Sequence, residues 1–469
     1  MTGAEGPGPR RAGQAGIGIL GALYLGKILI GTTRLLKRGG TTLPGRAALK
    51  ISPQLIALMA GQLPRGTVAI TGTNGKTTTA ALLADIIKES GLNCVHNSSG
   101  ANLAWGVATT FIEAGTWKAV LPAEIAVLEI DEGAFPALSE SLGPRCAVVT
   151  NIFRDQLDRF GGIQQVHDSI QKGVQSLHSD ATVCLNADDP LVAAIDSGGR
   201  KKLYYGLDLP AVTAPGLSPA TEISCPRCGG ILIYTGVFYA HLGRYRCPRC
   251  SFCRPEPEIK LRHFDISPGD STLLKLSLRG RSLQAKLPLP GIYNLYNALA
   301  AAAAATALKL PDSAIKEAFA AATPPAGRME QRRVDSKDLL IALIKNPAGA
   351  NEVLRTLLRE RGDQRLHLLI AINDHIADGK DVSWLEETDF EQFAAIRART
   401  GSMVFSGTRA IEAKERLLKS DFEPAKMVVE ASLQGALQKA LASTAKGEKL
   451  IILANYTAMM QLRRLLNWS

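Results

Sequence analysis

The chain has 469 residues, more than a single hydrophobic core usually serves, so two or three domains are expected. Its hydrophobic fraction of 46% and charged fraction of 21% are those of an ordinary soluble globular protein. Five of the eight cysteines crowd into residues 225–253 at metal-ligand spacing, and Cys94, Cys146 and Cys184 stand singly in apolar runs. This usage argues against disulfides and fits a reducing cytoplasm.

The net charge of +11 indicates an anionic partner, and the positive charge is concentrated at the N-terminus. Residues 1–50 hold eight lysines and arginines against Glu5 alone, a net charge of +7. The apolar stretch 15–36 has no small-residue cleavage site and is interrupted by Lys27, which argues against a signal peptide or a membrane span. We predict a helix within a basic arm at 1–60, either packed on the domain behind it or lying with basic residues against anionic lipid, peripheral to the inner face of the membrane.

From Gly66 onward, apolar strand-like runs alternate with helical stretches. The runs are "GTVAIT", "EIAVLEI", "CAVVTNI" and "ATVCLNA". This alternation predicts a parallel sheet covered by helices, in a central domain at 61–328. The cysteine-rich segment 221–257 interrupts it between Pro-containing stretches and is interpreted as an insertion, here called the inserted lobe. "ALAAAAAATALKL" is expected to be a helix.

A second alternation follows "TPPAGRMEQRRV". The runs "DLLIALI", "LHLLIAI", "GSMVFSG", "KMVVEAS" and "KLIILAN" are each followed by a helical stretch. They predict a smaller, Rossmann-like α/β domain at 329–469. Two such domains joined near Arg328 would form a cleft.

The stretch "VAITGTNGKTTTAALL" carries the strongest chemical signal. A strand runs into Gly72, Thr73, Asn74 and Gly75, here called the phosphate loop, and a helix opens at Lys76, Thr77 and Thr78. Backbone N–H groups of such a loop cradle a triphosphate, the lysine reaches the outer phosphates, and the hydroxyl of Thr77 is suited to hold Mg²⁺. We predict an ATP site with magnesium here.

These residues resemble the ATP loop of the Mur ligases and folylpolyglutamate synthetases, which form an amide after phosphorylating a carboxylate. Further stretches resemble the same families in the same order: "VLEIDEG", "VVTNIFRDQLDRFG", "LNADDP", "LPGIYNLYNALAA" and "GRMEQ". The resemblance implies a catalytic, magnesium-holding Glu129 and nucleotide-binding residues at Asn151, Asp155, Asn294, Asn297 and Arg328. Gln156 stands where these families carry a metal-binding histidine, which departs from the pattern.

The MurT family, the Mur-ligase-like subunits of lipid II isoglutaminyl synthases, offers a closer resemblance over nearly the whole chain. "GGTTLPGRAALKISPQLI", "AINDHIADGKDVSWLEE", "ANYTAMMQLRRLL" and an inserted four-cysteine ribbon carry it. The resemblance implies ATP-dependent amidation of the D-glutamate α-carboxylate in the lipid II stem peptide, with ammonia from a GatD-like glutaminase partner in a heterodimer. It also implies that an aspartate of this subunit assists the partner's Cys–His pair; Asp374, Asp378 and Asp381, which follow the strand "LHLLIAI", are the candidates.

The inserted lobe contains two Cys-Pro-Arg-Cys knuckles. Cys225, Cys228, Cys247 and Cys250 fit a tetrahedral zinc site, with Cys253 as an alternative to Cys250. The favoured interpretation is a structural zinc ribbon, because four sulfur ligands leave no open position for catalysis. The arginines and aromatic residues nearby also suggest a nucleic-acid ribbon, although some of that positive charge would balance a Zn(Cys)₄ site of net charge −2.

Three functions are therefore compared. The first is the MurT-type amidating ligase, which needs no nucleic acid. The second is a Mur or folylpolyglutamate-type ligase that adds an amino acid, and the third is a nucleic-acid-binding ATPase that uses the lobe and the basic arm. The MurT-like C-terminal stretches disfavour the second, and the distance in sequence between the basic arm and the phosphate loop disfavours the third.

Overall fold

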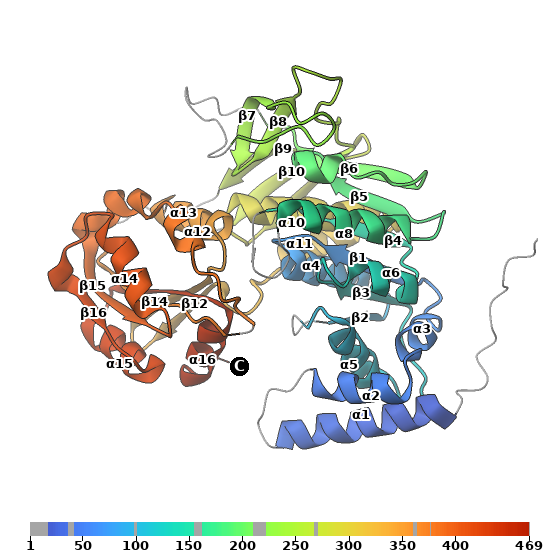
Figure 1. Cartoon of the computed structure of the whole chain (residues 1–469), viewed down its shortest axis with the longest axis horizontal. Helices are drawn as coiled ribbons and strands as arrows, with labels where there is room; N and C mark the ends of the chain where they lie inside the picture. Colours follow the sequence, from blue (N-terminus) through green and yellow to red (C-terminus); the bar gives the residue numbers. More distant parts are fainter. Residues whose placement is uncertain are drawn as a thin grey trace, which may run out of the picture.

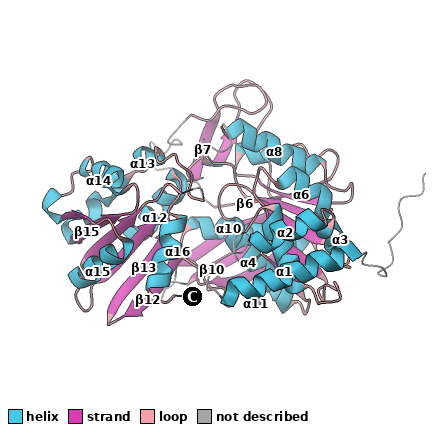
Figure 2. Ribbon diagram, turned by 60° about the horizontal axis from the view of Figure 1, so that its bottom comes forward, coloured by secondary structure: helices cyan, strands magenta, loops and turns pink. Residues whose placement is uncertain are grey.

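The computed structural model describes residues 17–35, 42–97, 101–153, 162–209, 222–266, 271–359, 364–375 and 377–468. These residues form two helix-covered sheets that lie side by side, and a two-stranded hairpin that projects from the larger one (Figures 1 and 2). Within the described parts, no helix is both long and apolar enough to cross a bilayer.

The larger sheet has nine strands in the order β11-β10-β9-β6-β5-β4-β1-β3-β2. Their bounds are β1 Thr67–Thr71, β2 Cys94–His96, β3 Ile125–Glu129, β4 Cys146–Val149, β5 Thr182–Asn186, β6 Lys201–Leu207, β9 Ile259–Ile266, β10 Thr272–Leu278 and β11 Arg281–Leu287. The strands from β2 to β9 pair in parallel, as predicted. The sheet is nevertheless mixed, because β9, β10 and β11 form an antiparallel edge that the sequence analysis did not include.

Alternation along the buried strands assigns side chains to the two faces of this sheet. Val68 and Ile70 pack with one helical layer, whereas Ala69 between them packs with the other. The first layer consists of α4 Lys76–Glu89, α10 Ile292–Ala307 and α11 Asp312–Ala320. The second consists of α1 Ile17–Leu35, α2 Leu43–Ile51, α3 Leu55–Ala60, α5 Ala104–Ala114, α6 Phe135–Leu142 and α8 Ile163–Gln175, and the short α9 spans Pro190–Ala193.

The smaller sheet has six strands in the order β12-β13-β17-β14-β15-β16. Their bounds are β12 Arg328–Val334, β13 Lys337–Leu343, β14 Leu366–Ala371, β15 Thr400–Ser406, β16 Met427–Val429 and β17 Lys449–Ala454. All pair in parallel except β12, which is antiparallel to β13. One face of this sheet carries α12 Pro347–Arg359, α13 Trp384–Glu387, the 3₁₀ helix η1 Phe390–Arg399 and α14 Ala410–Leu418. The other face carries α15 Leu433–Ser443 and α16 Tyr456–Leu465. A second 3₁₀ helix, η2, spans Pro424–Lys426.

The described part of the inserted lobe, residues 222–257, is built on the hairpin of β7 Ile233–Tyr239 and β8 Leu242–Arg246. Its core cluster holds only five buried side chains of its own, two of which are Cys225 and Cys247, packed against Ala193 of α9. A core this small stabilises a fold weakly, so the lobe depends on other restraints.

Candidate functional site

The phosphate loop connects the end of β1 to the start of α4. Gly72 and Gly75 have φ angles of +117° and +87°, in the region that side chains with a Cβ avoid. A Cβ at Gly75 would also lie 2.2 Å from Asn297 Oδ1, and one at Gly72 would lie 2.4 Å from Thr150 Oγ1. Both glycines are therefore required for the chain to turn here.

A segment after β4, residues 150–153, holds this loop in place. The backbone N–H groups of Thr73 and Asn74 donate to the backbone and side-chain oxygens of Asn151, at 2.8 and 2.9 Å. Thr150 Oγ1 and Asn151 Nδ2 both donate to the carbonyl of Asn74. The structure thus places Asn151 as a support of the loop, and Asp155 lies outside the described residues.

Lys76 is buried at the first position of α4 and lies over the phosphate loop. Its ammonium donates to the carbonyls of Gly72 and Thr73, and it pairs with Glu132 at 3.3 Å. Burial raises the pKa of Glu132, and the charge of Lys76 opposes that shift. Glu132 is thus a buried counter-ion that keeps the lysine above the loop, and an anionic phosphate would compete with it.

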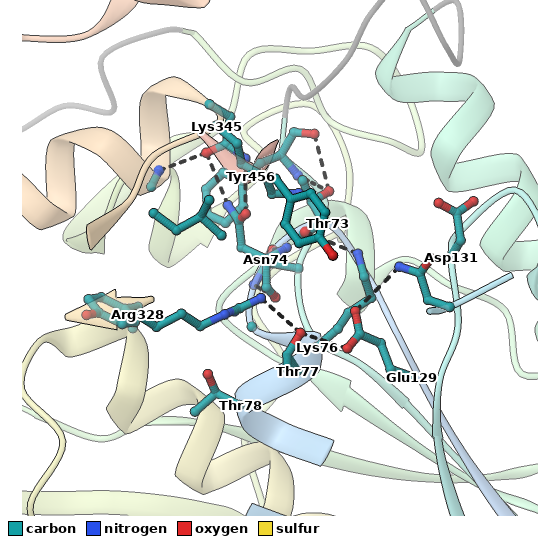
Figure 3. Close-up of a pocket in the computed structure, with 18 of the residues that line it drawn as sticks. Thr73, Asn74, Lys76, Thr77, Thr78, Glu129, Asp131, Arg328, Lys345 and Tyr456 are labelled. Atoms are coloured by element: carbon teal, nitrogen blue, oxygen red, sulfur yellow. Dashed lines mark hydrogen bonds between the residues drawn. The ribbon is translucent and has the colours of Figure 1, made fainter. Parts of the chain in front are cut away.

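A second polar cluster lies one residue further along α4, as Figure 3 shows. Thr77 Oγ1 donates to Glu129 Oε2 at 2.7 Å and accepts from Arg328 Nη2 at 2.9 Å. Burial lowers the pKa of Arg328, while the negative charge of Glu129 raises it. A hydroxyl and a carboxylate this close are the oxygen ligands that Mg²⁺ prefers, so the donor set at Thr77 and Glu129 fits that ion.

These groups line a cavity of about 680 Å³, a size suited to a small-molecule ligand. The larger sheet supplies Thr73 to Thr78, Glu129, Asp131 and Glu132, while the smaller sheet and its loops supply Lys345, Asn346, Ala377 and Tyr456. Asn346, which is 1% exposed, exchanges side-chain hydrogen bonds with Asn74 at 3.0 and 3.4 Å. The cavity therefore lies between the two sheets, and the phosphate loop contacts both.

The two predicted asparagines on α10 differ in their position. Asn297 lines the cavity and accepts from Thr79 Oγ1 at 3.5 Å. Asn294 is not among the lining residues; its side chain donates to the carbonyl of Pro290 and accepts from Asn297 Nδ2. Asn294 thus orients Asn297 from behind.

The three C-terminal aspartates occupy distinct environments after β14. Asp374 is partly exposed and pairs with Arg409 at 3.0 Å, and its pKa is lowered first by a hydrogen bond from Thr408. Asp378 is buried, which raises its pKa, and both of its carboxylate oxygens accept hydrogen bonds from Thr457. Asp381 accepts from the N–H of Ser383 at 2.8 Å. Asp374 therefore combines partial exposure with a lowered pKa, whereas Asp378 is buried with a raised pKa.

The four expected cysteines meet at the open end of the β7–β8 hairpin. The Sγ atoms of Cys225, Cys228, Cys247 and Cys250 all lie within 4.8 Å of one another. Cys225 and Cys250 are 3.7 Å apart and Cys228 and Cys247 are 3.4 Å apart, near the ~3.8 Å that tetrahedral Zn–S bonds of ~2.3 Å impose. The donor set fits zinc, and Cys253 lies outside the cluster.

Part of the positive charge of the lobe is used internally. Arg244 donates to Asp208 and Leu209 and lies over Phe238, while Arg227 lies over Phe252. Arg246 and Arg249 contribute fewer such contacts among the described residues. These contacts reduce the basic surface that would favour nucleic acid.

Several site residues were not recognised from the sequence. Glu132 belongs to the quoted "VLEIDEG" stretch, in which the acidic pair of Asp131 and Glu132 was a usable signal. Lys345 and Asn346 follow β13 directly, at the strand edge where α/β sites form, but no local motif marks them.

Two family models match the chain: the Mur ligase middle domain over residues 70–216 and the MurT ligase C-terminal domain over residues 343–459. The lipid II isoglutaminyl synthase subunit MurT of Staphylococcus aureus is 34% identical over 96% of this chain and 98% of its own length. The corresponding subunit of Streptococcus pneumoniae is 35% identical over 91% and 92%. A pseudomurein peptide ligase type C from Methanothermus fervidus shares the fold, with a TM-score of 0.62 and 26% identity over 86% of this chain and 78% of its own.

The order of the strands, the phosphate loop between the two sheets and this near full-length identity lead to one assignment. The chain belongs to the MurT family of Mur-ligase-like enzymes.

Proposed function

We propose that the chain uses ATP to amidate the α-carboxylate of D-glutamate in the lipid II stem peptide, giving D-isoglutamine for peptidoglycan synthesis. The observation that carries the proposal is the cluster of Lys76, Thr77 and Glu129 in a cavity shared with a MurT-type second sheet. The curated relatives bear the name lipid II isoglutaminyl synthase, which supports the same acceptor.

The first step activates the acceptor. A carboxylate oxygen attacks the γ-phosphorus of ATP, and the bond to the β,γ-bridging oxygen breaks with its electron pair leaving on ADP. Lys76 would neutralise the phosphates once its pairing with Glu132 is exchanged, and Mg²⁺ held by Thr77 and Glu129 would offset the charge on the transferred group.

The second step forms the amide. Ammonia attacks the acyl carbon, inorganic phosphate departs with the electrons of the C–O bond, and one proton is lost. Water at this point would return the carboxylate and waste ATP, so a cavity enclosed by both sheets favours the reaction.

Ammonia is proposed to come from a GatD-like glutaminase subunit, since the relatives are named as glutamine-hydrolysing subunits. A carboxylate that assists a partner's Cys–His pair has to be ionised and accessible. Asp374 is partly exposed and its pKa is lowered, whereas Asp378 is buried and its pKa is raised. We therefore assign this role to Asp374.

The four-cysteine cluster is proposed to hold a structural Zn²⁺. Two features support it: the sulfur spacing, and a lobe core with five buried side chains of its own, which is too small to be stable alone. We further propose a division of the chain into an arm at 1–60, a central domain at 61–328 and a C-terminal domain at 329–469.

The outer face of α1 is proposed to lie against the membrane surface. Ala22 and Leu23 pack inward, while Tyr24, Leu25 and Ile28 are exposed on the side away from the sheet. Trp117 is 51% exposed beside Tyr24, with Lys27 over its ring. Residues 17–60 contain no acidic side chain, and apolar, aromatic and basic groups together suit an anionic lipid interface.

The test incubates the full chain with ATP, Mg²⁺, lipid II and ammonium chloride, with and without a glutaminase subunit. Mass spectrometry should detect the small loss of mass that accompanies replacement of OH by NH₂. Addition of a whole amino acid would instead support an amino-acid ligase, and ATP hydrolysis stimulated by DNA would support the nucleic-acid alternative. Either result without amidation rejects the proposal.

A further inference from the structure

The β7–β8 hairpin connects the cysteine cluster to the nucleotide cavity. Its open end, where Ile233 pairs with Arg246, lies next to Cys247. Its closed end is the two-residue turn Ala240–His241 between the paired residues Tyr239 and Leu242. A seven-residue strand spans about 20 Å, so one hairpin reaches from the cysteines at its open end to the cavity at its tip.

Side chains at the hairpin tip, here residues 239–243, belong to the wall of the cavity. Tyr239 and Leu242 are almost fully buried and line it. Tyr239 packs on Phe153 with ring centroids 5.4 Å apart, and the ring of His241 meets the same Phe153 edge-on at 4.7 Å. His241 Nε2 also lies 3.3 Å from Asp189 Oδ2.

Phe153 and Asp189 in turn hold the segment that supports the phosphate loop. The N–H of Phe153 donates to Thr73 Oγ1 at 3.0 Å, and Asp189 Oδ2 accepts from the N–H of Ile152 at 2.8 Å. Asp189 is fully buried and also caps α9. His241 therefore contacts Phe153, and Phe153 contacts Thr73, so a single residue links the hairpin tip to the phosphate loop.

Hydrogen bonds next to the tip hold the hairpin against the larger sheet. The N–H of Gly243 donates to the carbonyl of Asp188, and a Cβ at Gly243 would lie 2.2 Å from the carbonyl oxygen of Gly236. The Asp188 carboxylate accepts from Arg254, which follows the last cysteine of the lobe, and from Tyr296 on α10. Ala240 has φ +49°, in the left-handed region that residues with a Cβ rarely adopt.

We propose that the hairpin tip is a positioning element of the nucleotide site, in which His241 fixes Phe153 and through it Thr73 of the phosphate loop. The inserted lobe then does more than fold around its cysteines: it sets the affinity of the loop for ATP. This inference rests on the ATP site of the proposed function.

The test measures Mg·ATP binding to the full chain by calorimetry, without acceptor. His241→Ala should weaken binding about 3- to 10-fold, the value of one edge-on aromatic contact, and raise KM for ATP with little change in kcat. His241→Phe, which keeps a ring against Phe153, should restore most of the affinity. Ile231→Ser, at an exposed position near the cysteines, is the control and should bind as the wild type does.

A double-mutant cycle separates positioning from general loss of structure. If His241 acts through Phe153, the pair His241→Ala and Phe153→Leu should weaken binding no more than the stronger single change. Bound zinc, measured by mass spectrometry, should be equal in all variants and thus report an intact lobe.

Wild-type affinity in His241→Ala, or effects of the two changes that multiply independently, would overturn the inference. A wild-type chain that binds no ATP would instead reject the proposed function itself.

Discussion

The two sheets meet at one cavity but bring different chemistry to it. The nine-stranded sheet supplies the phosphate loop and two carboxylates of the cavity: Glu132, which pairs with Lys76, and Glu129, beside Thr77. The six-stranded sheet supplies two cations, Arg328 and Lys345, and the neutral amide of Asn346. Its partly exposed pair of Asp374 and Arg409 lies apart from the cavity lining. The first arrangement suits phosphoryl transfer, and the second suits closing the site and meeting a partner.

This difference has a physical reason. Charge that develops on phosphate is stabilised best by fixed, buried ions, which a rigid strand-loop-helix unit can hold. Neutral amide hydrogen bonds, as between Asn74 and Asn346, can break and re-form at lower cost when two domains move. Substitutions in the two sheets should therefore have different effects on catalysis and on nucleotide binding.

The largest effect is expected for Lys76→Ala. Loss of the ammonium should lower kcat at least about 10²-fold with either glutamine or ammonia as nitrogen source, because phosphorylation precedes both routes. Rates of ADP release with lipid II measure it. Lys88→Ala, on the exposed side of the same helix, is the matched control and should keep its activity. Substantial activity in the Lys76 variant would show that the lysine of the phosphate loop is not needed for phosphoryl transfer.

Asp374→Asn should separate the two nitrogen sources. Glutamine-dependent amidation by the complex should fall about 10²-fold, because an amide cannot stabilise a protonated histidine in the partner. Ammonia-dependent amidation should be unchanged. The comparison is with Asp381→Asn, and equal loss on both nitrogen sources would place Asp374 in the ligase reaction instead.

Asn346→Ala tests the contact between the sheets. Removal of the two hydrogen bonds to Asn74 should raise KM for ATP about 3- to 10-fold and change kcat little, since the charged groups stay in place. Asn351→Ala, in helix α12, which begins just after Asn346, removes a hydrogen bond that Asn351 accepts from the N–H of Asp389; Asn351 does not line the cavity, and this variant serves as the control. A change in kcat alone would contradict the assignment.

The smallest effect concerns the stability of the second sheet. Hydrogen bonds from Arg416 lower the pKa of Glu391 to about 2 from 4.5. A depressed carboxyl pKa stabilises the fold above pH 4.5, and this contribution is lost as the pH falls toward 2. Glu391→Gln should therefore lower the melting temperature at pH 7, with a difference that narrows on acidification, and leave ATP binding intact. A pH-independent difference would mean that the charge is not involved.

Sequence alone predicted the parts of the site that are contiguous. The phosphate loop, Glu129 at a strand end and the paired cysteines each follow from local spacing, and both sheets follow from alternation. The antiparallel edge of β9 to β11 was missed because it lies beyond the inserted lobe, outside the regular pattern. Asn346 and His241 were missed because each acts on a residue far away in sequence, Asn74 and Phe153, so no local pattern records it.

The choice among the three aspartates also required the structure. The sequence "NDHIADGKD" gives no reason to prefer one of the three. Their exposure and their hydrogen-bond partners, Arg409, Thr457 and Ser383 respectively, do differ. Tertiary environment, rather than sequence position, separates the carboxylate proposed to face the partner from the other two.

The small core of the inserted lobe has a practical consequence for anyone who prepares this protein. With five buried side chains of its own, two of them cysteines, the lobe has few contacts to keep it folded if its thiols are oxidised or if a chelator removes the proposed zinc. If the hairpin tip positions the phosphate loop as proposed, such damage should weaken nucleotide binding while both large sheets stay folded. Reducing, chelator-free buffers are thus a condition for judging any variant of the enzyme.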